Sequence, residues 1–150
     1  MLWRRYRSAI LLAVPAGAAF GAVLGVSFYL VANPDYRTQG GWGAFISLLA
    51  SGAGIGGVTA SAGLIGGVVF LLLADRHLRG PGQARVRGGA MSAAAAAALL
   101  WLIIGLVGAV SSSGGAAWFP WVVVSAAITA ATTGGAAALI LRRVERLAAS

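Results

Sequence analysis

Cysteine and lysine are absent from this sequence of 150 residues, and acidic residues are almost absent. Without cysteine the chain can form no disulfide, no thiolate nucleophile and no cysteine-ligated metal site. Its three acids are Asp35, Asp75 and Glu145, and its one histidine is His77. Catalysis needs a positioned acid, base, nucleophile or metal, and these four side chains all lie outside the long apolar segments. We therefore expect no enzymatic activity, no cofactor and no bound metal.

Charge of either sign is rare, because only 9% of the residues are charged and 59% are hydrophobic. Soluble domains carry about 25% charged residues. Residues 8–34, 38–74 and 88–141 contain no charge at all. A helix of about 20 apolar residues crosses a bilayer core of about 30 Å, so each run is long enough to span a membrane and the last can span it twice.

These runs predict an all-α integral membrane protein, with residues 1–150 as a single domain of four transmembrane helices. We expect a compact bundle of two antiparallel hairpins, with crossings near 9–32, 55–74, 90–110 and 118–141. The segment SSSGGAA at 111–117 would divide the last run. The N-terminus also resembles a signal peptide, with a basic start and a small-residue site at Ala16 to Ala18. Because apolar residues continue to Ala32, we expect a retained first helix.

All 11 basic residues are arginine, and with the 3 acids they give a net charge of +8. Only Arg37 lies in the loop between the first two predicted crossings, and ten arginines lie on the alternate segments: Arg4, Arg5, Arg7, Arg76, Arg79, Arg85, Arg87, Arg142, Arg143 and Arg146. The positive-inside rule then places both termini in the cytoplasm. The arginine-rich, alanine-rich composition indicates a bacterium, and hence its plasma (inner) membrane. We expect these ten arginines to contact anionic lipid head groups rather than nucleic acid, since they are spread over separate loops.

The segment GAGIGG, residues 52–57, fits the G-x-G-x-x-G spacing of a dinucleotide-binding loop, with Asp75 downstream as the acid. That fold would need a helix with a polar, solvent-facing side after the loop. Residues 38–74 carry no charge, and no further strand-helix-strand pattern follows. We therefore interpret the glycines as part of a membrane helix.

The second helix is too long for a simple crossing. Residues 42–74 would span about 50 Å as one helix, against a membrane core of about 30 Å. The helix must bend or extend beyond the core. Glycine has weak helix propensity, so we expect this near Gly52–Gly57, with residues 42–54 as an extension along the membrane surface.

Glycine and alanine also recur at intervals of four residues, which places them on one side of a helix. Such ridges let two helices approach closely in lipid. The predicted packing residues are Gly17, Gly21 and Gly25 in the first helix, and Gly52, Gly56, Ala60, Gly63 and Gly67 in the second. The sequence leaves open whether each ridge faces the same chain or a second copy.

The missing chemistry and the ridges together predict a non-enzymatic helix-packing accessory or self-associating membrane subunit. Its partners would be the lipid bilayer and either a second copy or a larger membrane protein. The alternative is a small channel, holin-like pore or passive transporter, because carbonyls and hydroxyls such as those of Ser61 and Thr132 can line a path. A proton-coupled exporter is disfavoured, since it would need a charged group within the membrane.

Overall fold

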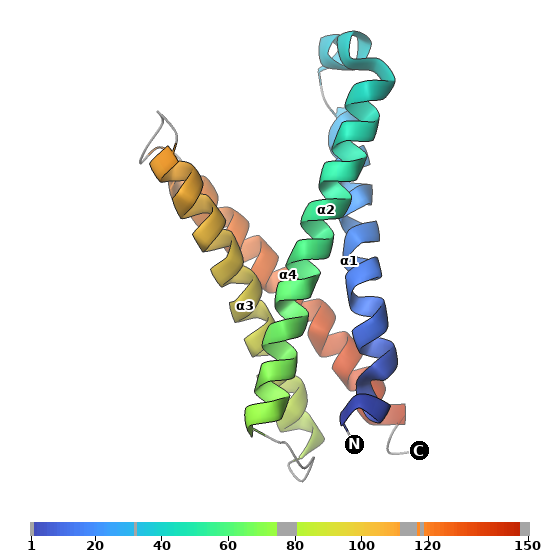
Figure 1. The fold of residues 1–150 in the computed structure, drawn as a ribbon, viewed down its shortest axis with the longest axis vertical. Helices are drawn as coiled ribbons and strands as arrows, with labels where there is room; N and C mark the ends of the chain where they lie inside the picture. The colour runs from blue at the N-terminus through green and yellow to red at the C-terminus, as the bar shows by residue number, and fades with distance from the viewer. Residues whose placement is uncertain (1, 32, 75–80, 112–116, 118, 148–150) are drawn as a thin grey trace. The chain divides into compact units, whose positions relative to one another are not determined.

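The computed structural model describes residues 2–31, 33–74, 81–111, 117 and 119–147, and within these residues the chain forms four α-helices (Figure 1). They are α1 (Leu2–Val31), α2 (Pro34–Ala74), α3 (Gly82–Ser111) and α4 (Phe119–Leu147). Each contains a segment long and apolar enough to cross a membrane: Ile10–Val31, Arg37–Ala74, Gly82–Ser111 and Phe119–Arg146. The prediction of an all-helical chain with four candidate membrane spans is confirmed.

Local sequence explains where two of the helices begin. The side-chain oxygen Oδ1 of Asn33 accepts a hydrogen bond from the backbone N–H of Asp35 at 3.1 Å, so Asn33 caps α2, and Pro34 occupies its first position. At α3, the carbonyl of Pro81 accepts hydrogen bonds from the N–H groups of Ala84 and Arg85, at 3.0 and 3.3 Å.

The chain divides into two compact units. We call Leu11–Ser61 the α1–α2 unit, and Met1–Ile10 with Ala62–Ser150 the α3–α4 unit. The first residues of α1 belong to the α3–α4 unit and the rest of α1 belongs to the α1–α2 unit. Helix α2 is also divided between the two units, after Ser61. Each unit has its own packing.

In the α1–α2 unit the two helices run side by side in opposite directions (Figure 1). Gly17 faces Gly56, Gly21 faces Gly52, and Gly25 faces Leu48. A β-carbon at any of these three α1 glycines would lie closer than 3.0 Å to the facing backbone carbonyl oxygen. The two backbones are therefore in direct contact, which only glycine permits.

Helix α2 is interrupted at Gly41, whose φ of 47° and ψ of −138° are outside the helical region. An L-residue with a side chain rarely adopts this conformation, so glycine is required here. Tyr29 of α1 secures the interruption, because its hydroxyl donates to the carbonyl oxygen of Gly41 at 3.3 Å. The Tyr29 ring also meets Phe45 edge to face, with ring centroids 5.4 Å apart.

The structure places the interruption of α2 at Gly41, and Gly52–Gly57 is helical. Helix α2 continues through residues 42–74, and the extension of 42–54 along the membrane surface stays a prediction. The reason lies in the packing. Gly52 and Gly56 lie against the α1 backbone, and a bend there would separate the two ridges.

The core of the α3–α4 unit forms along one side of α3, where Gly89, Ala93 and Ala97 are buried and Ala97 is 0% exposed. Helix α2 approaches this side through Gly66, where a β-carbon would lie 2.6 Å from that of Ala96. The two helices are also joined by a hydrogen bond. The hydroxyl of Ser92 donates to the carbonyl oxygen of Gly66 at 2.8 Å.

Large apolar side chains cover the outer faces of all four helices, for example Phe28, Ile65, Leu106 and Leu139, which are 60 to 72% exposed. Glycine and alanine take part in many contacts between helices, whereas these large side chains project outward. This is the reverse of a soluble bundle and suits a lipid environment.

Candidate functional site

A carboxylate near the end of α4 organises the most extensive group of polar contacts in the described side chains. Glu145 accepts two hydrogen bonds from Arg85 of α3, from Nε to Oε1 at 3.2 Å and from Nη2 to Oε2 at 2.9 Å. The second contact is also an ion pair. This fork of two N–H donors on two oxygens is the strong, directional form of an arginine–carboxylate contact.

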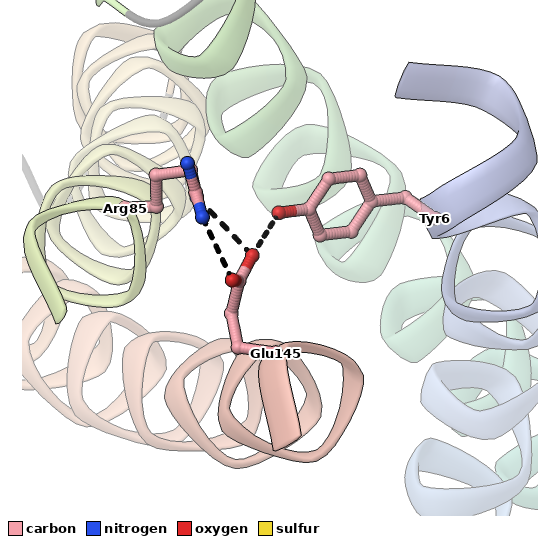
Figure 2. A network of polar contacts seen from close by, with 3 residues as sticks. All are labelled: Tyr6, Arg85 and Glu145. Carbon is pink, nitrogen blue, oxygen red and sulfur yellow. Dashed lines mark hydrogen bonds and ion pairs between the residues drawn. The ribbon is translucent and has the colours of Figure 1, made fainter. Parts of the chain in front are cut away.

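Tyr6 of α1 completes this group, since its hydroxyl donates to Oε1 of Glu145 (Figure 2). Figure 2 shows Tyr6 and Arg85 reaching the carboxylate from two different helices. Tyr6 is only 3% exposed. We call Tyr6, Arg85 and Glu145 the carboxylate cluster, and it holds three helix ends of the α3–α4 unit in a fixed arrangement.

Both charges of the cluster are largely withdrawn from solvent, with side chains 8% exposed for Arg85 and 13% for Glu145. Burying two charges is costly, and their attraction compensates only when the geometry is good. Loss of either charge would leave the other one buried and uncompensated. Both charges are therefore needed to keep this arrangement of the helix ends.

A hollow of about 670 Å³ lies beside the cluster, between the start of α3 and the end of α4. Its wall combines basic side chains with one acid and three uncharged residues: Arg85, Arg87, Arg142, Arg146, Glu145, Gly82, Gln83 and Val86. We call it the arginine hollow. All of its wall belongs to the α3–α4 unit.

The electrostatics of the hollow follow from the pairing in its wall. Arg85 and Glu145 neutralise each other, so the other charged residues of the described wall are Arg87, Arg142 and Arg146, with a total charge of +3. These three side chains are exposed, and no ion pair or hydrogen bond joins them to the described part of the chain. Such a site attracts anions. Among the described residues, no three His, Cys, Asp or Glu side chains gather to hold a metal ion.

Arg85 differs from its expected place among arginines that contact lipid head groups. It is buried, at 7% exposed, and is held by Glu145. The sequence pattern around Arg85 is no different from that around Arg87. The two differ in the structure because Arg85 forms an ion pair with Glu145.

The remaining arginines that were predicted to contact lipid head groups lie on α1, on α4 or outside the described residues. Arg4 and Arg5 lie in the first turns of α1, Arg7 is exposed on the same helix, and Arg143 is exposed on α4 but does not line the hollow. Arg76 and Arg79 lie outside the described residues, as do Asp75 and His77.

The glycine ridges meet within the chain. Gly17, Gly21 and Gly25 contact the segment of α2 that contains Gly52, Gly56 and Ala60. The ridges therefore hold α1 and α2 of one chain together, which sequence left open.

The other two predicted packing glycines of α2, Gly63 and Gly67, lie in the α3–α4 unit. A β-carbon at Gly63 would meet Thr133 of α4, and one at Gly67 would be 3.7 Å from the carbonyl oxygen of Gly89. Sequence reasoning missed Gly66, which packs more closely than Gly67, and the buried side of α3 around Ala93. In the alanine run 93–98 every side of the helix is small, so its spacing indicates no particular face.

A comparison of this chain with protein-family models, with curated proteins and with solved structures finds no match.

Proposed function

We propose that this chain is a multi-pass membrane protein that serves as a non-enzymatic accessory subunit and associates with a second copy of itself through the outer face of α4. The four candidate membrane spans and their apolar outer surfaces support the membrane location. The alternation of arginine-rich segments supports cytoplasmic termini, in the plasma membrane of a bacterium.

The observation that carries the proposal is a ridge of small residues left exposed on α4. Ala127, Ala131 and Gly135 follow at intervals of four, and all three are exposed on α4. A β-carbon at Gly135 would have no atom within 4 Å. Ile128 and Leu139, which are 60 and 69% exposed, flank the ridge. In lipid, a groove between larger side chains favours close packing by another helix.

The way this chain packs elsewhere favours a second copy as the occupant. In the α1–α2 unit a ridge of small residues meets another ridge of the same kind, Gly21 against Gly52. A symmetric dimer places the same patch of both subunits in contact, so each α4 ridge would supply the matching surface for the other.

The test is the oligomeric state in liposomes, measured by subunit photobleaching or by energy transfer between labelled chains as the lipid-to-protein ratio rises. Gly135→Leu should shift the equilibrium toward monomer by about tenfold or more. Gly108→Leu is the matched control, because Gly108 of α3 is also exposed and also has no neighbour within 4 Å of a β-carbon. A protein that is monomeric at every ratio, or that responds equally to both substitutions, would refute the proposal.

The pore alternative has weaker support. The hydroxyl of Ser61 donates to the carbonyl of Gly57, and that of Thr132 donates to the carbonyl of Ile128, each within its own helix. Their protons are therefore committed to the backbone. Ion flux through sealed liposomes that Thr132→Val changes while the oligomeric state persists would favour a pore over an accessory subunit.

A further inference from the structure

We propose that the arginine hollow is a binding site for a phosphate-bearing anion, held by Arg87, Arg142 and Arg146. The ligand is either the phosphate of a lipid head group or a free polyphosphate. This inference is independent of self-association, because the hollow lies at the ends of α3 and α4, away from the ridge of Ala127, Ala131 and Gly135.

The first argument is the imbalance of charge. Three arginines share one hollow, and the acid in its described wall, Glu145, is already engaged by Arg85 and Tyr6. Like charges held together repel each other, and a bound dianion would offset most of that repulsion. Arginine suits phosphate in particular, because its planar fork of N–H groups matches two phosphate oxygens.

The second argument is geometry. Arg142 and Arg146 are four residues apart and so share one side of α4, while Arg87 enters from α3. Donors on two helices can contact a ligand from two sides, whereas arginines on one helix face contact it from one side only. The volume of 670 Å³ lies within the range of about 300–1,000 Å³ that is usual for small-molecule sites.

The third argument is the backbone at the start of α3. Gly82 and Gln83 are its first two residues, and both line the hollow. The first N–H groups of a helix have no partner within the helix, and the helix dipole places partial positive charge there. These groups add to the field of the three arginines.

Two members of the carboxylate cluster, Arg85 and Glu145, also line the hollow. Their salt bridge joins α3 to α4, so both residues act as positioning residues and neither supplies the free charge. The hollow also lies at the ends of two candidate membrane spans, one beginning at Gly82 and the other ending at Arg146. Lipid phosphates are found at that level of a membrane.

The experiment measures two ligands on the full-length protein. In one arm, native mass spectrometry counts phosphatidylglycerol molecules retained by the protein, with phosphatidylcholine as the comparison. In the other arm, calorimetry measures pyrophosphate binding in a neutral detergent at constant ionic strength. We expect Arg142→Gln with Arg146→Gln to weaken binding in at least one arm by about tenfold or more. Arg87→Gln should weaken binding in the same arm.

Arg143→Gln is the matched control. Arg143 is next to Arg142 and exposed, yet it does not line the hollow, so its loss should change binding by less than about twofold. A loss in the lipid arm alone identifies a head group, and a loss in the pyrophosphate arm identifies a soluble anion. No saturable binding in either arm, or a loss with Arg143→Gln equal to that of the Arg142→Gln, Arg146→Gln double variant, overturns the proposal. Because Arg87, Arg142 and Arg146 are exposed and form no ion pair or hydrogen bond with the described residues, circular dichroism of every variant should match that of the parent.

Discussion

The contact between α1 and α2 at Gly21 predicts that a single added methyl group destabilises the α1–α2 unit. A β-carbon there would lie closer than 3.0 Å to the carbonyl oxygen of Gly52 and 2.9 Å from its carbonyl carbon, whereas ordinary contact begins at 3.4 Å. Both of these atoms belong to the backbone, so no side-chain rotation can relieve the clash. Gly21→Ala therefore forces the helices apart.

Overpacking of this kind costs about 1–3 kcal/mol. Gly54→Ala is the matched control, because Gly54 is helical and a β-carbon there would have no atom within 4 Å. At such a position alanine restricts the unfolded chain and stabilises by up to about 1 kcal/mol. Two substitutions of the same chemistry should thus act in opposite directions.

The absence of cysteine allows a clean measurement, since a donor and an acceptor dye can be attached at introduced cysteines. Leu24 of α1 and Ile46 of α2 are suitable sites, because they are 44 and 59% exposed. Loss of energy transfer during titration with sodium dodecyl sulfate reports separation of the helices. We expect the midpoint to fall for Gly21→Ala and to stay or rise for Gly54→Ala. Equal midpoints for the two variants would show that close approach at Gly21 does not hold the hairpin.

Three further predictions use the same unfolding titration. For the substitutions at Glu145, Tyr6 and Ser92, which belong to the α3–α4 unit, the dye pair is moved to α3 and α4. Gly41→Ala should destabilise by about 1–2 kcal/mol through its backbone angles alone, since a β-carbon there meets no atom, while Gly43→Ala should be neutral or stabilising. Glu145→Gln removes the charge that offsets a buried guanidinium and should cost about 3–5 kcal/mol, more than the roughly 1.5–3 kcal/mol lost with the charged hydrogen bond in Tyr6→Phe. Ser92→Ala removes one hydrogen bond between helices and should cost about 0.6 kcal/mol.

The number and approximate extent of the helices could be predicted because charge is excluded from membrane spans. The runs 8–34, 38–74 and 88–141 each correspond to one or two helices of the structure. The position of the break in α2 could not be predicted in the same way. Gly41 and the glycines of 52–57 have the same weak propensity, and only the contacts with Tyr29 and with α1 decide which of them leaves the helix.

The carboxylate cluster was beyond sequence reasoning for a different reason. Glu145 is 60 residues from Arg85 and 139 from Tyr6, and eleven arginines could each have been its partner. Periodicity indicates which side of a helix is small or apolar, but it does not indicate which two distant polar residues meet. The arginine hollow depends on that pairing, so it could not be located until the pairing was known.

The packing of small residues and the charge of the hollow are physically linked. Gly134 lets α4 approach α3 so closely that a β-carbon there would lie 3.0 Å from that of Ala94. Because the helices are this close, arginines of α3 and α4 line the same hollow, where their like charges repel one another. Glu145 offsets one of the four charges, and the described wall holds no second acid. The remaining repulsion favours an anion from outside the chain, so the same close approach that joins the helices also favours binding of a ligand at their ends.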